Sequence, residues 1–117
     1  MRTVAFIQAR LGSSRLKEKA LAVCEGRPLL AHVVERVQAM KGLDGVVVIT
    51  PRADAKKLAA AVPGVDVWSA DVPDVDVLAR YAAAAAHFTA DVIVRVTGDC
   101  PVWAPDGGAR VLQQFLA

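Results

Sequence analysis

The chain has 117 residues, 55% of them hydrophobic, with 14 basic and 12 acidic side chains. This length fits one domain with a modest core, and the net charge of +2 is too small to predict nucleic acid as the main partner. No apolar run approaches the ~18 residues of a membrane-spanning helix, and the N-terminus lacks the pattern of a signal peptide. Two cysteines, Cys24 and Cys100, make no disulfide framework, so we expect a cytoplasmic protein with no membrane partner.

Strand-like and helix-like patterns alternate along the whole chain. The segment GVVVIT is a continuous run of strand-forming residues, whereas PLLAHVVERVQAM repeats its apolar residues at helical spacing. In chain order the patterns predict a strand at 3–9, a helix at 28–40, a strand at 45–50, a helix at 53–62, a strand at 65–68, a helix at 74–88, a strand at 91–96 and a helix at 105–116.

Local signals mark several of these helices. Pro28 fits the first turn of the first helix, and Thr50-Pro51 indicates the start of the second, with Asp54 as a plausible cap. The last helix is expected to carry an apolar side made of Val111, Leu112, Phe115 and Leu116.

This alternation predicts the α/β class, with a mostly parallel sheet between two helical layers and a single domain over residues 1–117. Ligands of such open sheets bind beyond the carboxyl ends of the strands, where the strand order reverses. The informative loops are therefore those after the first and the fourth strands. We expect these two strands to be neighbours.

The loop after the first strand, QARLGSSRLKEK, has the composition of a phosphate site. Gly12 permits a close backbone approach, and Ser13 adds a hydroxyl donor. Arg10 and Arg15 offer planar guanidinium groups that match phosphate oxygens, and Lys19 supplies a further charge. The spacing is neither that of a Walker A loop nor GxGxxG. On these residues alone, a solvated basic loop is nearly as good an interpretation.

The loop after the fourth strand, VTGDCP, places a carboxylate at a strand end. Asp99 follows Gly98 and precedes Pro101 by two positions. Such a carboxylate can hold Mg²⁺, which takes one or two carboxylates together with substrate phosphates. An aspartate that caps a turn is the alternative.

Four blocks of the sequence together resemble a known family. VAFIQARLGSSRL, GRPLLAHVVERV, DVLARY and ADVIVRVTGDCP occur in the order found in cytidylyltransferases. The resemblance is to the spore coat polysaccharide biosynthesis protein F type, which is related to acylneuraminate and CMP-Kdo synthetases. It implies a three-layer α/β/α Rossmann-like fold of the nucleotide-diphospho-sugar transferase kind.

The resemblance also implies an activity and a set of roles. Family members let a sugar hydroxyl attack the α-phosphate of a nucleoside triphosphate, here expected to be CTP, with Mg²⁺ as cofactor and surface polysaccharide synthesis as the purpose. The implied nucleotide-binding residues are Ala9, Arg10, Gly12, Ser13, Arg15, Lys19 and Thr97, with Asp99 as the metal ligand and Arg10, Lys19 and Asp99 as the catalytic set.

The chain departs from the family pattern in three respects. Lys17 and Glu18 replace a Pro-Gly pair, and Ala104 replaces an acid. The resemblance covers only the front half of the family, so we expect a truncated, nucleotide-binding half. Two interpretations stay open: a nucleotidyltransferase, acting as a homodimer or with a complementing chain, and a non-catalytic nucleotide-binding module or pseudoenzyme.

Several residues near the family blocks are expected to be structural. Trp68 and Trp103 are predicted to pack in the core or at its rim. Asp76, Arg80 and Tyr81 in DVLARY leave both a role inside the fold and a substrate contact open.

Overall fold

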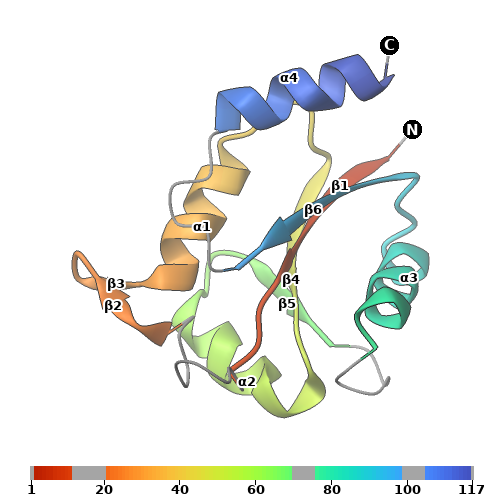
Figure 1. Ribbon diagram of the computed structural model, residues 1–117. Helices are drawn as coiled ribbons and strands as arrows, with labels where there is room; N and C mark the ends of the chain where they lie inside the picture. The colour runs from red at the N-terminus through yellow and green to blue at the C-terminus, as the bar shows by residue number, and fades with distance from the viewer. Residues whose placement is uncertain (1, 12–20, 70–75, 99–104, 117) are drawn as a thin grey trace.

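A parallel sheet organises the part of the chain that the computed structural model describes, which is residues 2–11, 21–69, 76–98 and 105–116. The strand order is β5-β4-β1-β6, so β1 lies inside the sheet (Figure 1). The four strands predicted from the sequence are confirmed, with ends that differ by at most one residue. They are β1 (Thr3–Gln8), β4 (Gly45–Ile49), β5 (Asp66–Trp68) and β6 (Val92–Thr97).

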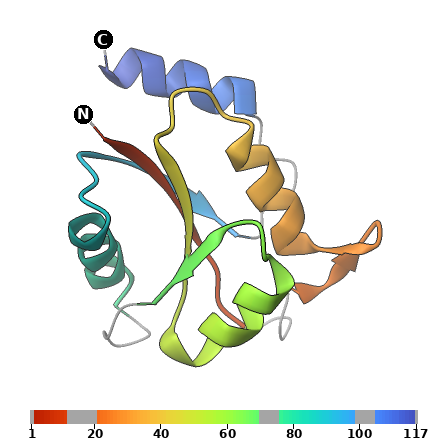
Figure 2. The ribbon, with the colours of Figure 1, turned by 180° about the vertical axis from the view of Figure 1, so that it is seen from behind.

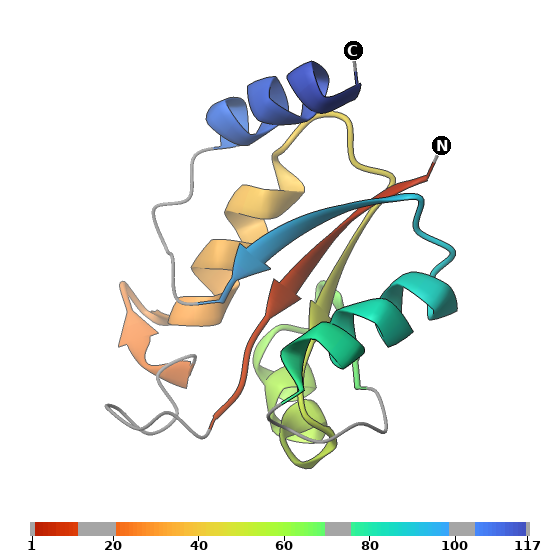
Figure 3. The same ribbon diagram turned by 45° about the vertical axis from the view of Figure 1, so that its right-hand side comes forward.

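Helices cover both faces of this sheet. Figure 3 shows α3 on one face and α1 on the other, and Figure 2 shows α2 on the same side as α1. The three-layer α/β/α arrangement is therefore confirmed. None of the helices within the described ranges is both long and apolar enough to cross a membrane. The helices are α1 (Leu29–Gln38), α2 (Arg52–Ala61), α3 (Val77–His87) and α4 (Pro105–Leu116).

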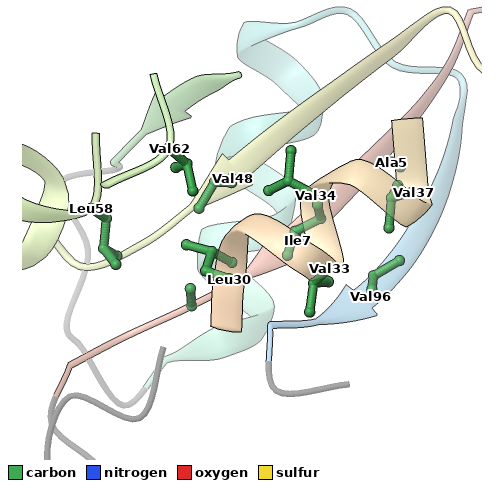
Figure 4. Close-up of a cluster of buried hydrophobic side chains, with 11 residues drawn as sticks. Ala5, Ile7, Leu30, Val33, Val34, Val37, Val48, Leu58, Val62 and Val96 are labelled. Atoms are coloured by element: carbon green, nitrogen blue, oxygen red, sulfur yellow. The ribbon is translucent and has the colours of Figure 1, made fainter. Parts of the chain in front are cut away.

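The core has two main clusters because successive side chains of β1 point to opposite faces. Ala5 and Ile7 pack against the buried face of α1 (Figure 4). This face has the helical spacing that the sequence predicts, and its side chains are Leu30, Val33, Val34 and Val37. Val4 and Phe6 pack on the other face, against Tyr81 and Ala84 of α3. Burial on both faces explains why β1 is a continuous apolar run.

Two of the expected helix starts differ in the structure. Pro28 is the N-cap residue of α1 rather than part of its first turn. Pro51 is the N-cap of α2, so Asp54 does not cap that helix but lies in its first turn. The cap of α3 is Asp76, whose carboxylate accepts a hydrogen bond from the Ala79 amide at 3.0 Å. Thr50-Pro51 as a helix start is confirmed.

A short hairpin before α1 has no counterpart among the predicted elements. It pairs β2 (Val23–Cys24) with β3 (Arg27–Pro28) in antiparallel register. The two turn residues, Glu25 and Gly26, have φ angles of 51° and 80°. Positive φ at both central positions is typical of a tight type I′ turn. Glutamate is an unusual residue at the first of these positions, so the sequence carries little signal for this turn.

The last helix packs with only one of its four expected apolar residues buried. Leu112 contacts a small cluster formed with Met40 and Val92. Val111 and Phe115 are 67% and 71% exposed, and Leu116 is exposed as well. The expected apolar side of α4 is therefore present but largely uncovered in the described structure.

The α3 residues of the DVLARY block serve the fold. Asp76 caps the helix, and Arg80 and Tyr81 are buried. Trp68 packs edge-on against Phe88, with ring centroids 5.8 Å apart, which confirms its predicted packing role. Trp103 lies outside the described residues.

Because the phenol of Tyr81 is buried, we expect the free energy of unfolding to depend on pH in the alkaline range. Burial raises the pKa of Tyr81, and Arg95, which lies 5.4 Å from the ring centroid, offsets part of that rise. A raised pKa favours the neutral phenol in the folded state. The neutral phenol therefore contributes to the free energy of unfolding. This contribution is fully present below pH 10.0, the ordinary pKa of tyrosine, and is lost as the pH rises through the higher pKa of the folded state.

Tyr81→Phe is therefore expected to flatten this dependence. Urea midpoints at pH 8 and pH 10.5 should fall less in the variant than in the parent chain. At pH 8 the two should differ little, because the buried Tyr81 hydroxyl has no hydrogen-bond partner among the described residues within ordinary bonding distance, so its removal leaves no buried polar group unpaired there. An equal fall in both proteins would contradict the assignment.

Candidate functional site

The carboxyl ends of β1 and β6 lie side by side. Gln8 pairs with Thr97 in parallel register, and the Gly98 amide donates a hydrogen bond to the Gln8 carbonyl at 2.8 Å. On the other side of β1 the strands β4 and β5 follow in turn, so the strand order reverses between β1 and β6. The expectation that the two informative loops leave adjacent strands is confirmed, and they leave at the place where open α/β sheets bind ligands.

Gly98 allows this close approach. A Cβ atom at this position would lie 2.8 Å from the Gln8 carbonyl oxygen and 3.1 Å from the Ala9 Cβ atom. Side chains essentially never come that close to backbone, so only glycine fits without a shift of one strand. The sequence alone identifies Gly98 only as the neighbour of Asp99. The clash with a residue 90 positions earlier follows only from the pairing of the strands.

The exit from β1 is held at two points. The Ala9 amide donates to the Ile49 carbonyl at 3.0 Å, and Ala9 is buried. Two residues later, the Leu11 amide donates to a carboxylate oxygen of Asp54 at 3.0 Å. The carboxylate expected to cap α2 therefore anchors the start of the first loop. Spacing along the chain gives no signal for this contact, because the partners are 43 residues apart.

The structure places three of the predicted site residues. Ala9 is buried at the end of β1, whereas Arg10 and Thr97 are exposed at the ends of β1 and β6. Arg10 follows the end of β1 by two residues, and the last residue of β1, Gln8, pairs with Thr97. The remaining predicted residues lie outside the described part of the chain: Gly12, Ser13, Arg15, Lys19 and Asp99.

The predicted metal site depends on a single carboxylate. Asp99 is the residue directly after Gly98 in the sequence, and a single carboxylate oxygen donor suits Mg²⁺ bound mainly through substrate phosphates. Among the residues that the structure describes, no three His, Cys, Asp or Glu side chains form a metal cluster. The magnesium site at Asp99 stays a prediction, because Asp99 lies outside the described ranges.

Comparison with known proteins agrees with this geometry. The sequence pattern of the family described as cytidylyltransferase matches residues 4–116. The chain belongs to the cytidylyltransferase family. The 3-deoxy-manno-octulosonate cytidylyltransferase 2 of Hydrogenovibrio crunogenus is 36% identical over 119 aligned positions, which cover 100% of this chain and 48% of the relative.

Two solved structures share the fold of this cytidylyltransferase chain. One is a CMP:2-keto-3-deoxy-manno-octonic acid synthetase complexed with CTP, with a TM-score of 0.89 and 28% identity. The other is a cytidylyltransferase from Leptospira borgpetersenii, with a TM-score of 0.87 and 32% identity. Each similarity covers 99% of this chain but only 48% and 49% of the solved chains. The chain thus spans about half the length of these relatives.

Proposed function

We propose that this chain is the nucleotide-binding unit of a nucleotidyltransferase that transfers CMP from CTP to a sugar. The observation that carries the proposal is the apposition of the β1 and β6 carboxyl ends. The basic Gly-Ser loop begins at the end of β1, and the segment that leads into Asp99 begins at the end of β6. The apposition brings these two starting points next to each other. Family membership and the similarity to a synthetase complexed with CTP support cytidine as the base.

The proposed roles follow from charge and position. Arg10, Ser13, Arg15 and Lys19, with the backbone at Gly12, bind the triphosphate and neutralise its charge. The backbone at Ala9 meets the base, and Thr97 contacts the base or the ribose. Arg10 is exposed at the end of β1, as this role requires. The Asp54 carboxylate acts indirectly: it accepts a hydrogen bond from the Leu11 amide and so holds the start of the loop in place.

The proposed reaction is an in-line displacement at phosphorus. The sugar hydroxyl oxygen forms a bond to the α-phosphorus of CTP, the bond from that phosphorus to the bridging oxygen of the β-phosphate breaks, and pyrophosphate leaves. The hydroxyl proton is lost to solvent. Mg²⁺, held by Asp99 and the phosphates, would stabilise negative charge on the reacting phosphates. Arg10 and Lys19 position the triphosphate and stabilise the leaving group.

The proposed acceptor is an acidic sugar destined for a surface polysaccharide. The relatives' names specify 3-deoxy-manno-octulosonate, a sugar acid, as their substrate. A second candidate is a module that binds CTP without turnover, because Lys17 and Glu18 replace a Pro-Gly pair of the family pattern and Ala104 replaces an acid. Turnover distinguishes the two.

Calorimetry of CTP binding with and without Mg²⁺, together with pyrophosphate release in the presence of 3-deoxy-manno-octulosonate, tests the proposal. We expect Arg10→Ala and Asp99→Ala each to weaken CTP binding in Mg²⁺ about tenfold or more, because each removes a charge-assisted contact of about 1.5–3 kcal/mol. Asp66→Ala is the matched control, since Asp66 is exposed at the start of β5, away from the carboxyl ends.

Each result has a defined meaning. Mg²⁺-dependent binding with pyrophosphate release supports the transferase. The same binding without release supports the module. If the parent chain binds neither CTP nor any other nucleoside triphosphate, or if Asp66→Ala weakens binding as much as Asp99→Ala, the proposed site is wrong.

A further inference from the structure

The backbone on either side of Arg10 is held by two hydrogen bonds. The Ala9 amide donates to the Ile49 carbonyl at 3.0 Å, and the Leu11 amide donates to a carboxylate oxygen of Asp54 at 3.0 Å. Ala9 is buried, whereas Arg10 is exposed. A residue between two fixed neighbours has little backbone freedom of its own. These two contacts therefore set the direction in which the Arg10 side chain leaves the end of the strand.

Asp54 lies on a well-packed part of the fold. It belongs to the first turn of α2, and its amide donates to the Pro51 carbonyl at 3.0 Å. Thr50, between β4 and α2, has no exposed surface, and its amide donates to the Trp68 carbonyl at 3.1 Å. Leu58, which is also fully buried, packs α2 into the core. A packed helix thus presents the carboxylate to the end of β1, which lies beside α2 in Figures 1 and 2.

A carboxylate close to a proposed phosphate site would by itself oppose the binding of an anion. Two features reduce this effect. The Asp54 carboxylate accepts a hydrogen bond from the Leu11 amide, and the first turn of α2 lies at the positive end of the helix dipole. The bond to Leu11 requires an acceptor oxygen, which the neutral amide of asparagine also supplies. The geometry therefore favours a role for the acceptor oxygen rather than for the negative charge.

The other end of β1 provides a matched contact. There the Thr3 amide donates to a carboxylate oxygen of Asp44 at 2.7 Å. Asp44 immediately precedes β4, so it lies at the amino ends of the strands, opposite to the proposed nucleotide site. Loss of either carboxylate removes one hydrogen bond to the backbone of the β1 segment. Only the loss at Asp54 should affect a ligand at the carboxyl ends.

We propose that Asp54 is a positioning residue for the triphosphate, because its hydrogen bond to Leu11 fixes the backbone that carries Arg10. This role rests on the proposed function, since Arg10 is the phosphate-binding residue that Asp54 positions. Thermodynamic linkage makes the effect reciprocal: if the Asp54 contact strengthens CTP binding, bound CTP strengthens the Asp54 contact by the same factor. Nucleotide binding at the end of β1 is thereby coupled to α2, a helix that supplies none of the proposed phosphate-binding residues.

Calorimetry of CTP binding in Mg²⁺ to paired variants of the 117-residue chain tests this proposal. Asp54→Ala removes the acceptor and should weaken CTP binding about fivefold to tenfold. Asp54→Asn keeps an acceptor oxygen and should bind CTP within about twofold of the parent chain. Asp44→Ala and Asp44→Asn are the matched controls and should leave CTP affinity unchanged. Circular dichroism checks that each variant is folded, and urea midpoints should fall by similar amounts in the two alanine variants.

Hydrogen exchange of two backbone amides measures the coupling to α2. Saturating CTP should slow exchange of the Leu11 amide by the same factor of about fivefold to tenfold in the parent chain, because linkage is reciprocal. The Thr3 amide, which is bonded to Asp44, should change by less than about twofold, because it lies at the far end of the strand. An unchanged Leu11 amide in the complex with CTP would contradict the coupling.

The remaining outcomes separate this role from the proposed function. If the parent chain binds CTP and Asp54→Ala binds it equally well, the positioning role is wrong. It is also wrong if Asp44→Ala weakens binding as much as Asp54→Ala, since the effect would then reflect a general loss of order. An Asp54→Asn variant as weak as Asp54→Ala would overturn the role of the acceptor oxygen. Absence of CTP binding to the parent chain would instead overturn the proposed function, and the role of Asp54 with it.

Discussion

Leu30→Ala is expected to lower the free energy of unfolding by about 3 kcal/mol, within the range of about 2–5 kcal/mol for buried leucines. Leu30 has no exposed surface and belongs to the cluster that joins α1 to β1, β4 and β6 (Figure 4). The cost combines the lost transfer free energy of the side chain with the cavity left behind. For a domain whose total stability is about 5–15 kcal/mol, this is a large fraction.

Chemical denaturation provides the measurement for Leu30→Ala. The midpoint should fall while the slope stays the same, because the surface exposed on unfolding hardly changes. Leu78→Ala is the matched control: Leu78 is 80% exposed on α3, so the same substitution there should change stability by no more than about 0.5 kcal/mol. Equal losses at the two positions would contradict the described packing of α1.

Gly98→Ala is expected to destabilise the fold by about 2 kcal/mol and to weaken CTP binding. The new Cβ atom would lie 2.8 Å from the Gln8 carbonyl oxygen, so the strand ends must move apart. Overpacking of this kind costs about 1–3 kcal/mol. The same movement displaces the starts of the loops that follow β1 and β6. It would therefore alter the distance between the proposed phosphate-binding residues and the proposed metal ligand.

Denaturant midpoints and CTP calorimetry on the same samples measure both effects. Gly64→Ala is the control, because no atom lies within 4 Å of the position where its Cβ would be. It should be neutral or slightly stabilising, since alanine restricts the unfolded chain. Leu30→Ala should not rescue Gly98→Ala, because Leu30 is the more distant contact at 3.4 Å and the Gln8 backbone remains. A stable Gly98→Ala with unchanged CTP affinity would contradict this account of the site.

The residues of the site also show where sequence reasoning stops. Arg10 is predicted from its place in the basic loop after the first strand, and Thr97 from the family resemblance; the structure puts both at neighbouring strand ends. The expected adjacency of β1 and β6 came from a general rule for open sheets, and the register of the strands now confirms it. The roles of Gly12, Ser13, Arg15, Lys19 and Asp99 stay predictions, since these residues lie outside the described ranges.

The alternation of strands and helices can be predicted from the sequence, because hydrophobic periodicity is a local property of consecutive residues. The buried face of α1 and the continuous apolar strand β1 are examples. The sequence by itself also determined that a basic Gly-Ser loop follows the first strand. The composition of that loop supports the phosphate-site hypothesis. The tertiary structure places the start of the loop, at the end of β1, beside the end of β6.

Only the tertiary structure decided the contacts between distant residues. It assigned Asp54 to the Leu11 amide rather than to a helix cap, and it made Gly98 a steric requirement through Gln8. It also left Val111 and Phe115 exposed beside β6 instead of in the core. The physical reason is the same in each case. Which groups meet depends on strand order and register, and these are set by the packing of the whole sheet.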